Sequence, residues 1–160
     1  MDRAEHIGQL LLARGWRVSV AESTAGGLIS ASLLTVAGAS RYYERGIVAY
    51  SRAAKIDTLG MPASLYTAQG SVHREAVKAM AEGVRRLSKA QVGVAESGVA
   101  GPDGGSSGLA IGTVWAAVVT PDGALQRELH LPGNRAEVMQ GIVARVLEML
   151  EEVLVPSQSA

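Results

Sequence analysis

Cysteine is absent from the 160-residue chain, which excludes disulfides, thiol catalysis and thiolate metal ligands. Phenylalanine is also absent and aromatic residues make up only 4% of the chain, so no stacking platform for nucleobases is expected. The histidines, His6, His73 and His130, are dispersed, and no two have the spacing of metal ligands. We therefore expect no metal and no cofactor. Any hydrolytic reaction must use a nucleophile other than cysteine.

Neither sign of charge is in excess, because 15 basic residues balance 15 acidic ones and no basic block occurs. Nucleic-acid-binding proteins usually concentrate lysine and arginine on one face, so nucleic acid is not the expected partner. Long apolar runs are missing too, and residues 1–6 lack the apolar stretch of a signal peptide. These absences favour a cytoplasmic protein that does not enter a membrane.

What the chain does contain is an alternation of helix and strand patterns over a length that suits one domain. Helices are expected over residues 2–14, 28–36, 51–59, 71–87 and 134–154, with a brief helical piece after Pro62. Strands are expected over residues 16–21, 42–50, 92–95, 111–120 and 124–131, with a hairpin turn at residues 121–123. This order predicts an α/β fold, a three-layer sandwich in which helices flank a mixed parallel and antiparallel sheet. Residues 1–155 would form the single domain and residues 156–160 a disordered tail.

Helix starts in this chain carry residues that are typical of N-caps. Asp2 with Glu5 fits a capping box at the first helix. Ser71 and Asn134 are expected to cap the long middle helix and the last helix. Side-chain oxygens at these positions would bond the otherwise free N–H groups of the first helical turn.

Two of the expected strands end in the same way, each running into a glycine-rich loop that carries a hydroxyl. Ala21 leads into Glu22-Ser23 and Ala95 into Glu96-Ser97. Ligands in open α/β sheets gather at the carboxyl ends of strands, where glycines let the backbone approach and helix N-termini favour anions. The loops suit a phosphorylated or carboxylated small molecule, although the glycines of the first loop fit a simple tight turn equally well. Neither loop matches a P-loop or a dinucleotide-binding fingerprint.

A serine nucleophile needs a base, and no histidine lies in either loop. Lys55 follows the strand that ends at Tyr50-Ser51, on a short helix that leaves the same edge of the sheet. Burial could lower the pKa of this lysine enough for it to act as a base. A solvated surface charge is the other interpretation of an isolated helix lysine.

Several motifs occur along the chain in one order: Ala21-Glu22-Ser23, Gly26-Gly27, Glu44-Arg45-Gly46, Ala49-Tyr50-Ser51 with Lys55, Gly60, Gly70-Ser71-Val72, residues 97–106 and Gly112-Thr113-Val114-Trp115. In this order and spacing the chain resembles the CinA C-terminal domain family, the stand-alone form of nicotinamide-nucleotide amidase. The resemblance extends from about residue 5 to residue 152.

The resemblance implies hydrolysis of the carboxamide of nicotinamide mononucleotide to nicotinate mononucleotide and ammonia, without a cofactor. It assigns the nucleophile to Ser23, the base to Lys55 and an assisting hydroxyl to Tyr50. The implied substrate-binding residues are Gly26, Gly27, Ser97, Gly98, Gly101, Gly104, Gly105 and Arg135. N–H groups between residues 24 and 27 are expected to stabilise the oxyanion, and Lys55 would return a proton to ammonia through Tyr50.

The sequence departs from the family near the nucleophile, where Thr24-Ala25 replaces the usual Cys-Thr. Glu96 stands where a small or apolar residue is common, and an acid beside a phosphate site would weaken binding unless it points away. The alternative function is therefore a catalytically weak CinA-like protein that binds a ligand or partner in competence or DNA-damage physiology. The resemblance also implies self-association, with residues 111–119 and the last helix as candidate surfaces. The N-terminal domain of longer relatives, and its activity, are not expected here.

Overall fold

The computed structural model describes residues 1–158, and in them five strands form one mixed sheet. The strands are β1 (Val18–Glu22), β2 (Tyr43–Val48), β3 (Val92–Gly98), β4 (Thr113–Thr120) and β5 (Gly123–His130), in the order β2-β1-β3-β4-β5. Strand β1 runs parallel to β2 and β3, whereas β4 is antiparallel to β3 and β5. The expected mixture of parallel and antiparallel pairing is confirmed.

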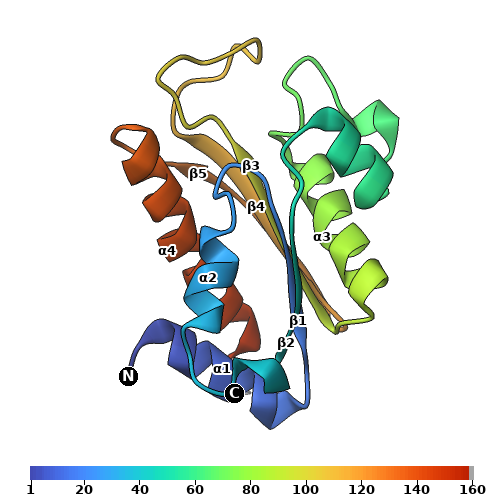
Figure 1. The fold of residues 1–160 in the computed structure, drawn as a ribbon, viewed down its shortest axis with the longest axis vertical. Helices are drawn as coiled ribbons and strands as arrows, with labels where there is room; N and C mark the ends of the chain where they lie inside the picture. Colours follow the sequence, from blue (N-terminus) through green and yellow to red (C-terminus); the bar gives the residue numbers. More distant parts are fainter. Residues whose placement is uncertain (159–160) are drawn as a thin grey trace.

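Helices cover both faces of this sheet (Figure 1). The helices α1 (Arg3–Arg14), α2 (Leu28–Leu34) and α4 (Arg135–Leu154) lie on one face, and α3 (Arg74–Ser88) lies on the other. Short helical turns occur at η1 (Ala39–Arg41), η2 (Ala54–Thr58) and η3 (Ala63–Leu65). The predicted three-layer sandwich in a single domain is confirmed.

The side chains of the inner strands alternate between two apolar clusters, because successive residues of a strand point to opposite faces. Val18, Val20, Val92 and Val94 join the larger cluster under α1, α2 and α4. Ala95 and its neighbours on that side of the sheet pack under α3. Both faces of β1 and β3 are buried, as expected for parallel strands covered by helices on each side.

A close backbone contact fixes η2 against α3. The carbonyl of Leu59, just after η2, lies where a Cβ on Gly83 would be, so only glycine fits at that point of α3. Val77, Met80 and Val84 of the same helix are fully buried beneath the sheet. The segment that carries Lys55 is therefore held on the α3 side of the molecule.

Helix capping agrees with expectation at one of the sites considered. Asn134 and Glu137 form a reciprocal capping box at α4. At α3 the prediction of Ser71 is wrong: His73 is the N-cap, and its Nδ1 accepts from the N–H of Ala76 at 3.4 Å. Asp2 precedes α1, but within residues 1–158 its side chain makes no capping hydrogen bond.

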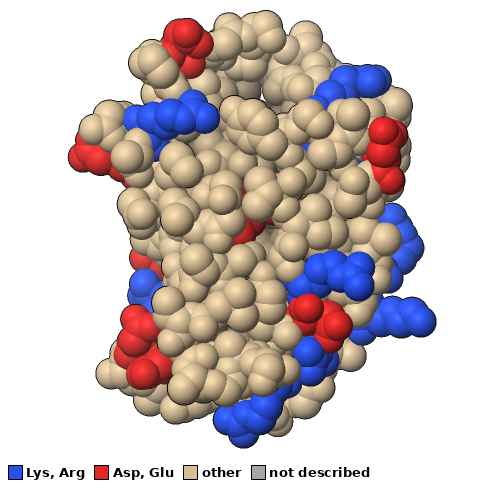
Figure 2. Space-filling model, in the orientation of Figure 1, with Lys and Arg blue, Asp and Glu red and all other residues tan. Residues whose placement is uncertain are grey.

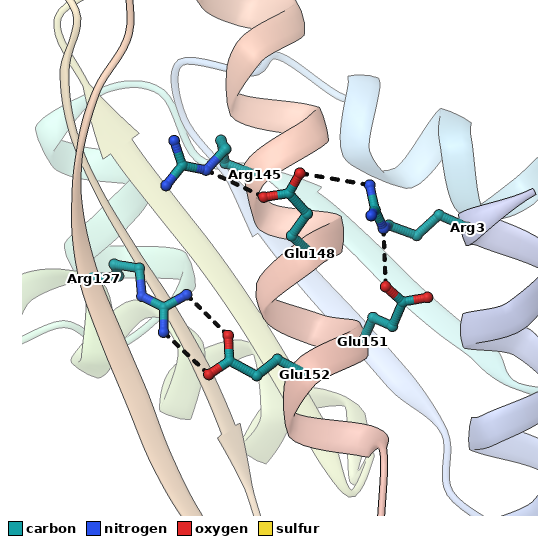
Figure 3. Close-up of polar contacts among 6 residues, drawn as sticks. All are labelled: Arg3, Arg127, Arg145, Glu148, Glu151 and Glu152. Carbon is teal, nitrogen blue, oxygen red and sulfur yellow. Dashed lines mark hydrogen bonds and ion pairs between the residues drawn. The ribbon is translucent and has the colours of Figure 1, made fainter.

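The last turns of α4 are tied to α1 and β5 by ion pairs (Figure 3). Arg3 contacts Glu148 at 3.6 Å and Glu151 at 3.0 Å, and Arg127 binds both oxygens of Glu152 at 3.0 and 3.2 Å. These side chains are largely exposed, so each pair contributes roughly 0–1 kcal/mol. The apolar face of α4 stabilises its packing far more than these surface pairs do.

Strand β4 lies between β3 and β5 with nearly all of its side chains buried, so its residues offer no open face for self-association in the part of the chain described. The prediction that residues 111–119 form such a surface is wrong for this strand. Residues 156–158 of the expected tail are exposed and come after α4 without regular structure, and residues 159–160 lie outside the described residues. In residues 1–158 no helix combines the length and apolar character of a membrane span. Figure 2 shows charged side chains of both signs scattered mainly around the edge of one face.

Candidate active site

A cleft of about 410 Å³ opens at the carboxyl ends of β1 and β3. Two loops on either side of these strand ends, over residues 66–72 and 97–107, form most of its wall, and both lie at the same end of the sheet in Figure 1. Its volume falls in the range that holds small-molecule ligands. Its lining is rich in hydroxyls and includes Ser23, Thr24, Tyr50, Lys55, Tyr66, Thr67, Gln69, Ser71, Ser97, Gly98, Gly101, Asp103, Gly104, Gly105, Ser106, Ser107 and Arg135.

Ser23 lies at the bottom of this cleft, 5% exposed, directly after β1. Its own N–H donates to Oε1 of Glu96 at 2.7 Å, and the N–H of Ala25 donates to the same oxygen at 2.8 Å. The turn that carries the hydroxyl is thus held from below by a carboxylate from the neighbouring strand. Glu96 does not line the cleft, so the acid that threatened to repel a phosphate points away from it.

The environment of Glu96 is unusual for a carboxyl group. It is fully buried, and within residues 1–158 its second oxygen, Oε2, has no hydrogen-bond partner. Burial raises the pKa of Glu96 from 4.5 to about 7, against the lowering effect of the N–H groups of Ala25 and Ser23. The nearby charge of Glu22 also raises this pKa.

Glu22 takes up the N–H groups at the start of α2. Its oxygens accept from the N–H groups of Gly27 at 3.1 Å, Ile29 at 2.8 Å and Ser30 at 2.9 Å. Together with Glu96, this carboxylate occupies the N–H groups of Ala25 and Gly27 that were expected to stabilise an oxyanion. For Ala25 and Gly27 that expectation is wrong, because their N–H groups already donate to carboxylates, and the start of α2 is not a free anion site.

Thr24 joins the two strand-end turns. Its hydroxyl donates to the carbonyl of Gly98 at 3.0 Å and accepts from the N–H of Gly98 at 2.9 Å. A Cβ on Gly98 would collide with Val114, so glycine is needed for this close approach. The hydroxyl of Thr24 therefore holds the Ser23 turn against the end of β3, so that Ser23 and Ser97 lie on the same side of the cleft.

Lys55 faces the cleft from the other side. Its side chain is buried, with only 3% exposed, and its Nζ donates to the carbonyl of Tyr50 at 2.7 Å. Burial lowers the pKa of Lys55, and the negative charge of Glu96 opposes this shift. The structure thus places the predicted base and nucleophile in one cleft and makes the amine easier to deprotonate than an exposed lysine.

Tyr50 and Arg135 meet at the rim. One guanidinium nitrogen of Arg135 donates to the carbonyl of Gly101 at 2.6 Å, and the other lies 3.4 Å from the hydroxyl of Tyr50. Tyr50 contacts Lys55 through its carbonyl rather than its hydroxyl. The expected path of a proton from Lys55 through the Tyr50 hydroxyl is not the arrangement found here.

Ser71 is a site residue that the sequence pattern does not reveal. The hydroxyls of Ser71 and Ser97 are 2.7 Å apart, and both serines are buried at the cleft wall. The pattern predicts a helix cap instead, because a serine three residues before a helix carries the same local signal in both roles. Only its pairing with Ser97, from a distant strand, distinguishes them.

Gly26 and Gly27 were expected in the site but lie outside the cleft lining. Both have positive φ, 63° and 101°, and allow the turn between β1 and α2. The other glycines predicted to bind substrate, Gly98, Gly101, Gly104 and Gly105, do line the cleft. Among residues 1–158, no three His, Asp or Glu side chains gather in a way that could hold a metal ion.

Comparison with known proteins agrees with this architecture. The model of the CinA C-terminal domain matches residues 1–154. The chain belongs to the CinA C-terminal domain family. Nicotinamide-nucleotide amidohydrolase PncC of Enterobacter agglomerans, a relative that matches over 92% of both chains, is 41% identical. A protein of Desulforamulus reducens that is named as competence-damage inducible is 43% identical over 92% of this chain.

Relatives in the CinA family differ in length. The chain spans 36% of the length of the Desulforamulus reducens protein, so it matches only one part of that relative. Among solved structures, competence damage-inducible protein A of Klebsiella pneumoniae has a TM-score of 0.92 and 32% identity, covering 98% of this chain and 97% of that one. The Agrobacterium tumefaciens competence/damage inducible protein has a TM-score of 0.86 and 34% identity, covering 98% of each chain.

Proposed function

We propose that this protein hydrolyses the carboxamide of nicotinamide mononucleotide, with Ser23 as nucleophile and Lys55 as base. The observation that carries the proposal is the placement of a buried lysine of lowered pKa in the same cleft as a serine at a strand end. The similarity to an amidohydrolase of nearly equal length supports the choice of substrate.

In the proposed reaction, Ser23 Oγ attacks the carboxamide carbon while Lys55 Nζ takes the hydroxyl proton. The carbon–nitrogen bond of the resulting tetrahedral oxyanion breaks as Lys55 gives this proton to the departing nitrogen. Ammonia leaves and an acyl ester remains on Ser23. Water then attacks the ester, with Lys55 taking its proton and passing it back to Ser23, and nicotinate mononucleotide is released.

The oxyanion needs a donor other than the occupied N–H groups of the Ser23 turn. Two hydroxyl protons are present in the pair formed by Ser71 and Ser97, and their mutual hydrogen bond uses one of them. The second hydroxyl proton is available to the cleft. We assign oxyanion stabilisation to this pair.

Phosphate binding falls to the outer part of the cleft. Arg135 lies at the rim, where its guanidinium can bind a phosphate through two parallel hydrogen bonds. The hydroxyls of Ser106 and Ser107 line the same region. A mononucleotide would then place its phosphate near Arg135 and its carboxamide at Ser23.

The test is incubation of the protein with nicotinamide mononucleotide, with ammonia and nicotinate mononucleotide measured together. Nicotinamide and nicotinamide riboside serve as matched substrates that lack the phosphate. We expect equal amounts of the two products from the mononucleotide and rates lower by about 10²-fold or more without the phosphate. Binding of the mononucleotide in a thermal-shift assay without release of ammonia would contradict the proposal and support the ligand-binding alternative.

A further inference from the structure

Glu96 lies beneath the nucleophile without touching the cleft. It belongs to β3, and alternation along that strand puts its side chain on the face of Val92 and Val94, under α2 and α4. Lys55 belongs to η2, which packs on the α3 face. Oε1 of Glu96 bonds the backbone of the Ser23 turn at two points, and Ser23 lines the same cleft as Lys55.

The carboxylate is an expensive group to bury. Its Oε2 lies in a fully buried position and is not hydrogen-bonded to any of residues 1–158. A buried carboxyl group with one unpartnered oxygen destabilises the fold. An apolar side chain at this place in β3 would avoid that loss.

The charged groups around Glu96 are few. Glu22 at the end of β1 raises the pKa of Glu96, and Lys55 is the cation on which Glu96 acts. From β4 and α4 the same face of the sheet receives apolar side chains (Ala116, Val138 and Ile142). The arginines at the helix starts are engaged elsewhere, Arg135 on Gly101 and Arg74 over the ring of Trp115.

We propose that Glu96 is a positioning residue for Ser23: its carboxylate holds the backbone of the Ser23 turn, and its negative charge acts on the Lys55 amine from the far side of that turn. The proposal rests on the proposed function for the identity of the reaction but not for the geometry. An ionised Glu96 favours the protonated form of Lys55. Its charge therefore raises the lower pH limit at which Lys55 can accept a proton from Ser23, against the effect of burial.

Two substitutions separate the backbone contact from the charge. Glu96→Gln keeps an oxygen that accepts from Ser23 and Ala25 but removes the charge, whereas Glu96→Val removes both. Val118→Ala is the matched control, because Val118 is a fully buried residue of β4 on the same face of the sheet and outside the cleft. Thermal melting of each variant gives the loss of stability against which activity is compared.

Two readouts are measured between about pH 6 and pH 9.5: ammonia release from nicotinamide mononucleotide, and the rate at which a fluorophosphonate labels Ser23. We expect Glu96→Gln to shift the acid limb of both profiles to lower pH by about 0.5–1 unit, because Lys55 loses a stabilising negative neighbour. Glu96→Val should lower kcat about 10–100-fold through misplacement of Ser23. Val118→Ala should keep the wild-type profile.

An unshifted acid limb in Glu96→Gln would overturn the role of the charge. The positioning role would be overturned if Glu96→Val kept the wild-type kcat and labelling rate. It would also be overturned if, at equal melting temperature, Glu96→Val lost no more kcat than Val118→Ala does. If Ser23 is labelled but no ammonia forms, the proposed substrate is wrong and the labelling profiles still decide the role of Glu96. A folded wild type that shows neither labelling nor hydrolysis would overturn both proposals.

Discussion

The same three residues, Ala-Glu-Ser, end two neighbouring parallel strands, yet their side chains have different surroundings. Ala21 and Glu22 are the last residues of β1 and Ser23 comes directly after it, whereas Ala95-Glu96-Ser97 stands one residue before the end of β3, with Ala21 opposite Ala95 in the register. Glu22 bonds the N–H groups of the helix that comes after its own strand. Glu96 reaches across to the turn of the other strand and leaves one oxygen without a partner in the described chain.

The segment after each strand explains this difference. Helix α2 begins shortly after β1 and offers Glu22 the free N–H groups of its first turn. A glycine-rich loop comes after β3 and offers Glu96 no helix start. Identical local sequences therefore place their carboxylates differently. Glu22 has hydrogen-bond donors for both oxygens, whereas Glu96 lies in an unfavourable electrostatic environment directly under the proposed nucleophile.

The largest expected effect separates the two serines. Ser23→Ala should lower kcat by about 10⁴-fold or more, because the attacking oxygen is lost. Ser97→Ala should lower it by about 10–10³-fold, since Ser71 remains as a second hydroxyl at the oxyanion. Steady-state kinetics with nicotinamide mononucleotide measure both. Equal losses in the two variants would mean that the serines do not have the separate roles assigned to them.

The next effect separates the two glutamates by the pH dependence of stability. The raised pKa of Glu96 means that the folded state binds its proton more tightly than the unfolded state. Its contribution is fully present below about pH 4.5 and is lost as the pH rises to about 7, which amounts to about 3 kcal/mol. Urea titrations of the wild type across this range should show the loss.

The matched variants identify which carboxyl group is responsible. Glu96→Gln should abolish this fall in the free energy of unfolding. Glu22→Gln should keep most of this fall, losing only the part that the Glu22 charge contributes to the raised pKa of Glu96. It should also lower stability by about 1–2 kcal/mol at neutral pH, because the N–H groups of α2 lose a charged acceptor. Superimposable pH curves for the wild type and Glu96→Gln would show that Glu96 has no raised pKa.

A smaller effect tests the link between the two strand ends. Thr24→Val keeps the shape of the side chain but removes the hydroxyl that both donates to and accepts from Gly98. We expect a loss of about 1–2 kcal/mol in unfolding free energy and a raised KM, since the two walls of the cleft are no longer joined. Thr24→Ser keeps the hydroxyl and should behave as wild type. Equal behaviour of the two variants would show that the link is unimportant.

The smallest effect concerns an exposed carboxylate, in contrast to the two buried ones. Glu152→Gln breaks the pair with Arg127 shown in Figure 3, which water and salt already screen. The unfolding free energy should fall by less than about 1 kcal/mol, with no change in kcat. A loss as large as that of Glu22→Gln in the same urea titration would contradict this ranking of buried and exposed carboxylates.

Much of the fold could be predicted because its signals are local. Strand and helix periods predicted the element types, and the alternation of helices and strands predicted a layered sandwich. Ser23, Lys55 and Ser97 could be assigned to one site because carboxyl ends of parallel strands share an edge of the sheet. Asn134 could be predicted as a cap because its motif is complete within four residues.

The features that escaped prediction depend on partners distant in sequence. Nothing near Glu96 in the sequence indicates that its carboxylate bonds Ser23 and Ala25, which stand 73 and 71 positions earlier in the chain. The same is true of the pairing of Ser71 with Ser97, and of the contact of the Tyr50 hydroxyl with Arg135 instead of Lys55. Gly26 and Gly27 were misplaced because a glycine that permits a turn and a glycine that approaches a ligand look alike in sequence.

The central claim, that Ser23 forms an acyl ester, is tested most directly by adding hydroxylamine to the reaction. Hydroxylamine competes with water for an acyl-enzyme and converts it into a hydroxamate, whichever step limits the rate. We predict that wild type and nicotinamide mononucleotide yield the hydroxamate in proportion to hydroxylamine, with ammonia released throughout, and that Ser23→Ala yields none. Ammonia release that is accompanied only by the free acid at every hydroxylamine concentration would contradict the account.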